Sequence, residues 1–132
     1  MDSRTSRDSI RILVVDDLSS MRKIVRSQLV SLGFSNIIEA RDAKDAVQKL
    51  EYETFSLIIS DWHMPEMSGF ELLEHVRAQT RLEQTPFILL TKQTDKASVL
   101  QAKHSGVSFY LGKPFTTEVL ESKIKEALPT IA

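Results

Sequence analysis

Cysteine is absent from this sequence of 132 residues. Its absence excludes disulfides, cysteine nucleophiles and thiolate-bound metals, and it fits the reducing cytoplasm, where we expect the protein to be located. Long apolar runs are missing too, since no stretch approaches the roughly 18 residues of a membrane span. Neither sign of charge is in large excess: 17 basic and 18 acidic residues leave a net charge of -1. Bulk electrostatics therefore gives no indication of a nucleic-acid or membrane partner.

The chain is long enough for one domain with a core of its own, and 42% of its residues are hydrophobic. Residues 1–9 are polar and lack the apolar segment of a signal peptide. We therefore predict a flexible N-terminal tail over residues 1–9 and a single domain over residues 10–132.

Short apolar runs alternate with amphipathic segments along the chain. The runs predict strands at 12–15, 36–40, 55–60, 86–90 and 107–111, and helical spacing predicts helices near 21–32, 42–50, 68–76, 95–104 and 117–128. In these helices we expect Ile24 and Phe70 to face the core, and Asp42 and Ser68 to act as N-caps. The alternation predicts an α/β fold with a central parallel sheet. For this length, the favoured form is the flavodoxin-like, doubly wound (βα)5 sheet with strand order 2-1-3-4-5.

Polar residues follow four of the predicted strands. Asp16 and Asp17 follow the first strand, Asp61 the third, Thr91 the fourth and Lys113 the fifth, whereas the second strand offers nothing comparable. Because the carboxyl ends of parallel strands lie on one edge of the sheet, we expect these side chains to converge there.

Three converging carboxylates repel one another unless cations lie between them. Lys113 supplies one positive charge, and Mg²⁺ is the divalent ion best suited to carboxylate and phosphate oxygens. An acid, a hydroxyl, an ammonium and Mg²⁺ around one point favour phosphoryl transfer. Asp61 is the predicted nucleophile because its strand is central, while Thr91 and Lys113 would contact phosphoryl oxygens.

The sequence resembles the receiver domains of two-component response regulators, most closely the single-domain members that act in chemotaxis. The resemblance covers about residues 10–128, and its matching segments are 13–17, 20–26, 32–34, 60–62, 64–65, 67–69 and 113–115. It implies that Asp61 accepts a phosphoryl group from a histidine kinase. It also implies that Asp16, Asp17, Asp61 and the backbone carbonyl of His63 surround Mg²⁺.

The same resemblance implies a signalling role rather than an enzymatic one, apart from the protein's own phosphorylation and dephosphorylation. Thr91 and Tyr110 would rearrange on phosphorylation and alter the face made by the fourth helix, fifth strand and fifth helix. In the chemotaxis members that face meets the flagellar motor switch, and a phosphatase is a further expected partner.

Three residues depart from the family pattern near the predicted site. Lys92 stands where the family usually has a small residue, and His63 and Gln93 occupy positions at which the family tunes the lifetime of the phosphoryl group. We expect these three residues to affect kinetics or the choice of phosphodonor.

Other functions remain open at this point. One alternative is a pseudo-receiver that binds partners without being phosphorylated, and another is a receiver that only drains phosphate and never contacts the motor. A dehalogenase-like phosphatase would need Asp-x-Asp after the first strand, whereas Leu18 follows Asp16 and Asp17 here. A flavodoxin-type flavin binder would need a phosphate loop in place of these acids.

Overall fold

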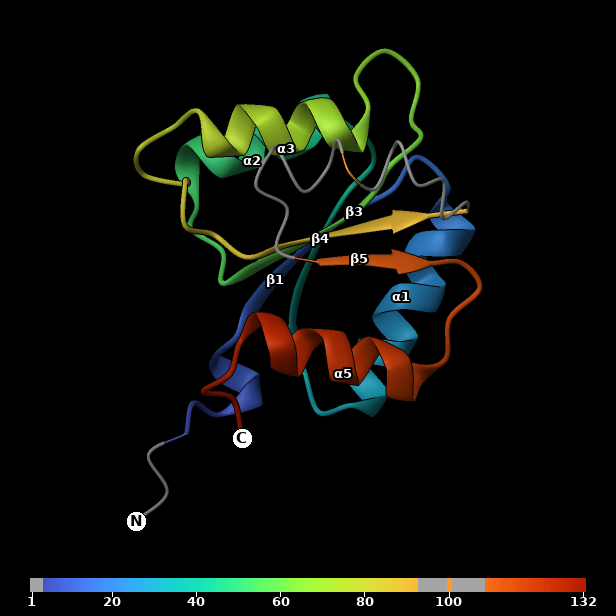
Figure 1. Ribbon diagram of the computed structural model, residues 1–132, viewed down its shortest axis with the longest axis vertical. Helices are drawn as coiled ribbons and strands as arrows, with labels where there is room; N and C mark the ends of the chain where they lie inside the picture. The colour runs from blue at the N-terminus through green and yellow to red at the C-terminus, as the bar shows by residue number, and fades with distance from the viewer. Residues whose placement is uncertain (1–3, 93–99, 101–108) are drawn as a thin grey trace.

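A computed structural model describes residues 4–92, 100 and 109–132, and these residues form a parallel β-sheet with helices on both faces (Figure 1). The strands are β1 (Arg11–Val15), β2 (Asn36–Ala40), β3 (Leu57–Asp61), β4 (Phe87–Thr91) and β5 (Phe109–Gly112). Their order is β2-β1-β3-β4-β5, and every neighbouring pair is parallel. This topology confirms the predicted flavodoxin-like sheet with order 2-1-3-4-5.

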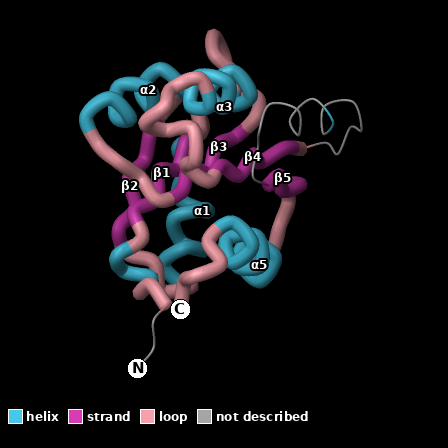
Figure 2. The backbone as a smooth tube through the Cα atoms, turned by 60° about the vertical axis from the view of Figure 1, so that its left-hand side comes forward, coloured by secondary structure: helices cyan, strands magenta, loops and turns pink. Residues whose placement is uncertain are grey.

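The helices of the described residues are the short 3-10 helix η1 (Arg7–Ser9), α1 (Ser19–Ser31), α2 (Ala43–Tyr52), α3 (Gly69–Arg77) and α5 (Thr117–Ala127). The helix predicted over 95–104 lies outside the described residues except for Leu100. In Figures 1 and 2, α2 and α3 cover one face of the sheet, and α1 and α5 cover the other.

Both faces of the sheet are buried, which explains why the strands are almost continuously apolar. Along β1, Leu13 and Val15 belong to a core cluster that includes buried residues of α2 and α3, whereas Ile12 and Val14 belong to a cluster with buried residues of α1 and α5. Burial on both faces leaves the carboxyl edge of the sheet as the place for polar side chains.

The predicted caps of two helices are confirmed. Asp42 precedes α2 and its side chain accepts a hydrogen bond of 2.7 Å from the backbone N–H of Asp45. Ser68 and Glu71 form a reciprocal capping box at the start of α3. These bonds satisfy backbone donors that the first helical turn leaves without partners.

Two sequence-based details are wrong. Asp61 and Thr91 are the last residues of β3 and β4 rather than the residues after them, because the parallel pairing continues one residue further than the apolar run. Ile24 is 51% exposed, since no described element covers that part of α1. The inward orientation predicted for Phe70 is confirmed, because Phe70 packs, partly buried, against the core cluster that contains the fully buried Leu72, Leu73 and Val76 of α3.

The N-terminal segment contacts the C-terminus of the chain. Thr5 forms a parallel bridge with Ile131, donating to the Thr130 carbonyl at 2.7 Å and accepting from Ala132 N–H at 2.8 Å. Arg7 donates to the main-chain carbonyl of Leu32 at 2.6 Å. Flexibility of residues 1–9 and the division of the chain at residue 10 stay predictions, but Thr5 and Arg7 make these contacts in the structure.

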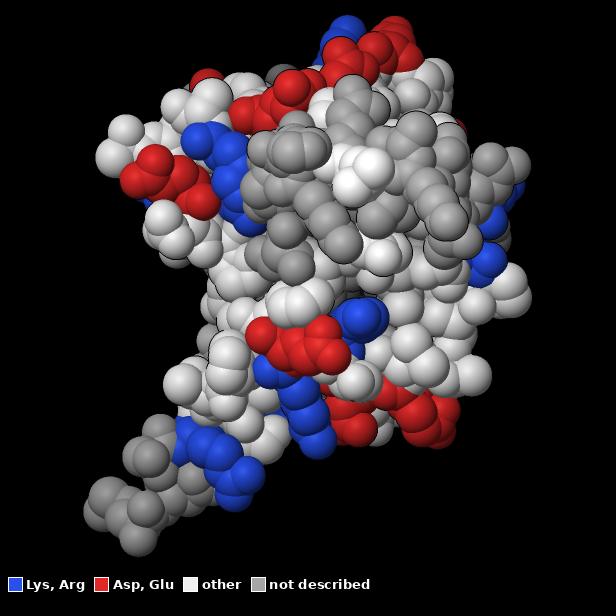
Figure 3. Space-filling model, in the orientation of Figure 1, with Lys and Arg blue, Asp and Glu red and all other residues white. Residues whose placement is uncertain are grey.

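Charged side chains of both signs are interspersed over the described part of the face in Figure 3, as the net charge of -1 suggests. Among the described residues, no helix has the length and apolar character needed to span a membrane.

Candidate functional site

Three carboxylates meet at the carboxyl edge of the sheet. Asp16 follows β1 directly, Asp17 lies in the loop before α1, and Asp61 ends β3. One carboxylate oxygen of each residue lies within 4.8 Å of the others. Asp16 and Asp61 are buried, with exposed fractions of 1% and 7%, whereas Asp17 is exposed. The three acids therefore form one cluster that is open to solvent on the side of Asp17.

The ammonium of Lys113 lies inside this cluster. Lys113 follows β5, and its Nζ donates to Asp61 Oδ1 at 2.8 Å and lies 3.5 Å from Asp16 Oδ2. Its side chain is only 11% exposed. Lys113 thus bridges two carboxylates at the ends of different strands. Its single positive charge balances one of the three negative charges, and two remain unbalanced.

The carboxyl of Asp16 is perturbed by its burial and its neighbours. Burial raises the pKa of its carboxyl above the ordinary value; the hydrogen bond from Leu18 N–H lowers it, and the charge of Asp61 raises it further. Asp16 Oδ1 accepts from Leu18 N–H at 3.0 Å, whereas Oδ2 is buried without a hydrogen-bond partner among the described residues. A buried carboxylate oxygen without a donor is the arrangement expected of an atom that ligates a cation.

These residues fit Mg²⁺. The possible ligands are carboxylate oxygens, which Mg²⁺ prefers, and Asp16 Oδ2 is buried without a hydrogen bond from the described residues. A divalent cation would balance the two negative charges that Lys113 leaves, as the arithmetic of three carboxylates and one ammonium requires. The carboxylate cluster could therefore hold Mg²⁺ together with water and phosphate oxygens.

Thr91 and Tyr110 lie on β4 and β5, the two strands that come after the strand of Asp61 in the order of the sheet. Thr91 ends β4 and is 3% exposed, and its carbonyl accepts from Lys113 N–H at 2.7 Å. Tyr110 lies on the edge strand β5, opposite Leu89 in the parallel register, and is partly buried. Their rearrangement on phosphorylation stays a prediction.

The loop after Asp61 is held close to β3 by Gly69. The N–H of Gly69 donates to the Trp62 carbonyl at 2.8 Å. A Cβ atom at residue 69 would lie 2.0 Å from the Asp61 carbonyl oxygen, which no side chain tolerates. Glycine is therefore required for α3 to begin against the main chain of Asp61.

His63 and Lys92 both line the pocket of about 310 Å³ that contains Asp61 and Lys113. Both side chains are exposed, so they stand at the mouth of the pocket rather than among the buried acids. The roles of His63 and Lys92 in tuning kinetics, and of the His63 carbonyl as a ligand, stay predictions. Gln93 lies outside the described residues.

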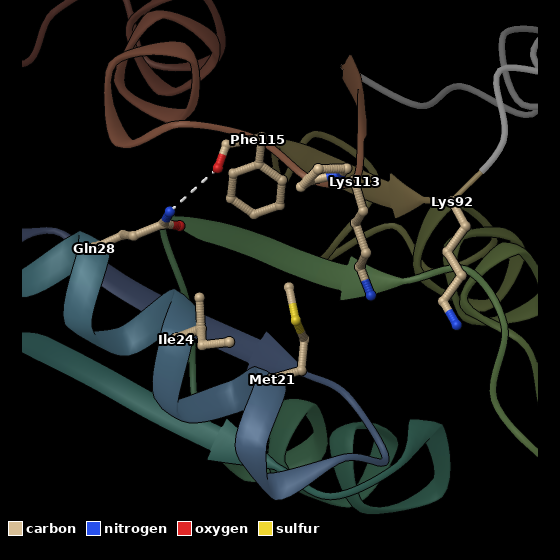
Figure 4. Close-up of a pocket in the computed structure, with 7 residues that line it drawn as sticks. Met21, Ile24, Gln28, Lys92, Lys113 and Phe115 are labelled. Atoms are coloured by element: carbon tan, nitrogen blue, oxygen red, sulfur yellow. Dashed lines mark hydrogen bonds between the residues drawn. The ribbon is translucent and has the colours of Figure 1, made fainter.

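An apolar groove that sequence reasoning missed adjoins the acid cluster. It has a volume of about 510 Å³ and is lined by Met21, Ile24, Gln28, Lys92, Lys113, Pro114 and Phe115. In Figure 4, Met21 and Ile24 extend from α1 toward Phe115 of the segment after β5, and Gln28 donates to the Phe115 carbonyl at 3.4 Å. Lys92 and Lys113 line both the groove and the acid pocket, so the two cavities are neighbours that share these side chains.

Two further residues near the acids escaped the sequence analysis. Arg22 of α1 donates to the Asp16 main-chain carbonyl at 2.7 Å and to Glu39 Oε1 at 3.1 Å. Glu39 lies on β2, the strand for which we expected no contribution to the site. Partial burial raises the pKa of Glu39, but the bonds from Arg26 and Arg22 outweigh this effect and hold it below the ordinary value.

Comparisons with known proteins agree on one family. The model of the response regulator receiver domain matches residues 12–125. The chemotaxis protein CheY of Pseudomonas aeruginosa is 40% identical over 117 residues, which cover 89% of this chain and 94% of CheY. The structure of the chemotaxis response regulator CheY4 of Vibrio cholerae superposes with a TM-score of 0.83 at 34% identity, covering 90% of this chain and 98% of CheY4.

A second similar structure contains the metal considered above. It is the receiver domain of the sensor histidine kinase PA1611 from Pseudomonas aeruginosa, with a magnesium ion coordinated in its active-site cleft. Its TM-score is 0.82 at 25% identity, covering 91% of this chain and 98% of that receiver.

Proposed function

The chain belongs to the response regulator receiver domain family, and we propose that it is a phosphoacceptor that takes a phosphoryl group from a histidine kinase onto Asp61. The convergence of three carboxylates with the buried ammonium of Lys113 carries this proposal. The similarity to chemotaxis receivers over about nine-tenths of the chain supports a role in chemotaxis.

In the transfer step, a carboxylate oxygen of Asp61 attacks the phosphorus of a phosphohistidine. A P–O bond forms, the P–N bond breaks, and its electron pair stays on the imidazole nitrogen of the donor. Lys113 is positioned to contact a phosphoryl oxygen, because its Nζ already lies 2.8 Å from Asp61 Oδ1. Thr91, at the end of the neighbouring strand β4, would offer its hydroxyl to a second oxygen.

Asp16, Asp17 and Asp61 would hold Mg²⁺, with the His63 carbonyl as a further ligand. When bound, the ion supplies positive charge that reduces the repulsion between the acids and an anionic donor. The residues of the chain keep their own tasks: Asp61 forms the bond, Lys113 orients its carboxylate, and Gly69 lets the loop after β3 lie close to it.

The apolar groove along α1 gives the donor a place to bind. A kinase must bring its phosphohistidine to the Asp61 pocket, and the groove shares Lys92 and Lys113 with that pocket. We assign the groove to the kinase segment that carries the histidine. Ile24→Ser should slow loading from the kinase and leave loading from acetyl phosphate unchanged, because Ile24 is exposed and lines only the groove.

Output would pass through the face that includes β5 and α5, where Tyr110 is partly buried on the edge strand. Phosphorylation would shift the population of two conformations of Thr91 and Tyr110, and only contacts that differ between them can drive the shift. The proposed target is a flagellar motor switch protein, and a phosphatase would return the protein to its resting state.

Transfer of labelled phosphate from a panel of phosphorylated histidine kinases tests the proposal. The unmodified protein should accept label in the presence of Mg²⁺, and Asp61→Asn should accept none. Asp8→Asn is a suitable control, because Asp8 is an exposed acid of η1 and lies outside the carboxylate cluster.

Retention of label by Asp61→Asn would overturn the assignment of the acceptor. Failure of every kinase and of acetyl phosphate to label the unmodified protein would favour the pseudo-receiver. Normal labelling without binding to a motor switch protein would favour a receiver that only drains phosphate.

A further inference from the structure

The Asp16–Asp17 turn is held from β2 in two ways. The N–H of Asp16 donates to the Ala40 carbonyl at 3.2 Å. On its other side, the Asp16 carbonyl accepts from Arg22 Nη1 at 2.7 Å, and Glu39 binds Arg22 Nε at 3.1 Å. The neighbouring residues Glu39 and Ala40 thus restrain both main-chain groups of Asp16, one directly and one through the guanidinium.

The Asp16 carbonyl belongs to the peptide group that joins Asp16 to Asp17. Its orientation therefore helps to set the directions of the Cα–Cβ bonds from which both carboxylates extend. Asp17 is exposed, so packing restrains it little, and the restraint on this peptide matters most for its position. Arg22 is well placed to supply that restraint because its side chain is only 17% exposed and its planar guanidinium donates from two nitrogens at once.

We propose that Arg22, held by Glu39, is a positioning residue for the cation site: it fixes the Asp16–Asp17 peptide and thereby brings both carboxylates to Mg²⁺. The inference rests on the Mg²⁺ site proposed above. It assigns to β2 a part in a site whose direct ligands all come from other segments.

Positioning and charge predict opposite effects for Arg22. A guanidinium this close to the carboxylates repels a divalent cation, so through charge alone its removal would tighten Mg²⁺ binding. Through positioning, its removal frees the peptide and weakens binding. The sign of the change in affinity separates the two.

Arg26 provides a matched control on the same helix. It donates to the other Glu39 oxygen at 2.7 Å and to the Ile37 carbonyl at 3.0 Å. Arg26 therefore pairs with Glu39 as Arg22 does, but among the described residues it makes no hydrogen bond to Asp16. Methionine at either position keeps most of the aliphatic stem and removes the donors.

The experiment titrates Arg22→Met, Arg26→Met and Arg22→Lys with Mg²⁺ while following Trp62 fluorescence, and measures urea unfolding of each without Mg²⁺. We expect the dissociation constant for Mg²⁺ to rise about tenfold in Arg22→Met, the lower end of what loss of a residue supporting a metal ligand causes. Arg26→Met should stay close to the unmodified protein even where its stability falls equally. Arg22→Lys should also bind more weakly, because an ammonium keeps the charge without the guanidinium fork.

Unchanged or tighter binding in Arg22→Met would overturn the inference, as would equal weakening in Arg22→Met and Arg26→Met at equal stability. Full affinity in Arg22→Lys would also contradict it, since donation from two guanidinium nitrogens would then not be needed to position the peptide. If the unmodified protein does not bind Mg²⁺ at all, the cation site itself is wrong. If the unmodified protein binds Mg²⁺, Asp17→Asn abolishes the binding and Arg22→Met leaves it intact, the cation site stands and only the role of Arg22 is wrong.

Discussion

Replacement of Lys113 by methionine removes the charge that holds two buried acids together. Lys113 Nζ lies 2.8 Å from Asp61 Oδ1 and 3.5 Å from Asp16 Oδ2. At an effective dielectric constant of about 20, each contact carries a Coulomb energy of roughly 5 kcal/mol. Much of that energy is offset by the cost of taking the ammonium out of water, so the net loss from leaving the acids unpaired is about 3 kcal/mol.

Urea unfolding at pH 7 without divalent cations measures this loss. Lys49→Met is the matched control, because Lys49 Nζ lies 2.9 Å from Asp45 Oδ1 on the surface of α2, with its side chain 29% exposed. A partly exposed pair of this kind, one helical turn apart, contributes less than about 1 kcal/mol. Saturating Mg²⁺ should recover part of the loss in Lys113→Met, because the ion replaces positive charge among the same carboxylates.

A loss in Lys113→Met no larger than that in Lys49→Met would refute the reasoning, because the buried acids would then not depend on the ammonium. A gain in stability would mean that desolvation of Lys113 outweighs its attraction to both carboxylates. Equal responses of the two variants to Mg²⁺ would show that the lost stability does not arise at the cation site.

Further substitutions test other parts of the account. Gly69→Ala should destabilise the protein by about 3 kcal/mol in urea unfolding, because its Cβ would lie 2.0 Å from the Asp61 carbonyl oxygen; a loss below about 1 kcal/mol would contradict the close approach. The hydrogen bonds from Arg22 and Arg26 lower the pKa of Glu39 below its ordinary value of 4.5. They therefore stabilise the fold fully at pH values above 4.5, and this contribution is lost as the pH falls through the lowered pKa. Unfolding measured across this range should therefore show a steeper acid loss for the unmodified protein than for Glu39→Gln, and parallel curves would refute the ion pair. Lys92→Ala should speed loading by acetyl phosphate in stopped-flow measurements of Trp62 fluorescence, because an exposed lysine blocks more by bulk than it attracts by charge. Slower loading would mean that the charge dominates.

Sequence reasoning succeeded where the pattern is local or repeats along the chain. The alternation of strands and helices predicted a parallel sheet, and the commonest strand order for this length proved correct. The carboxyl ends of the strands then placed Asp16, Asp61 and Lys113 on one edge, where their side chains meet. The capping box at Ser68 was visible because its two partners are three residues apart. The strands and the capping box follow from spacing, whereas the strand order follows from the general topology of such folds.

Other features depend on contacts that spacing does not encode. Helical periodicity placed Ile24 in the core, although no described element covers that part of α1, and the residue lines the groove instead. Arg22 and Glu39 are 17 residues apart, so neither reveals the other in the sequence. The contact of Thr5 with Ile131 joins the two ends of the chain and has no local signal at all.

Chemical trapping of the phosphorylated residue is the most direct test of the central claim. Borohydride reduces an aspartyl phosphate to homoserine, so peptide mass spectrometry after loading from a kinase identifies the acceptor. The account predicts homoserine at residue 61 and unmodified aspartate at residues 16 and 17. Trapped label at Asp16 or Asp17, or acid-labile phosphate on His63 with Asp61 intact, would contradict it.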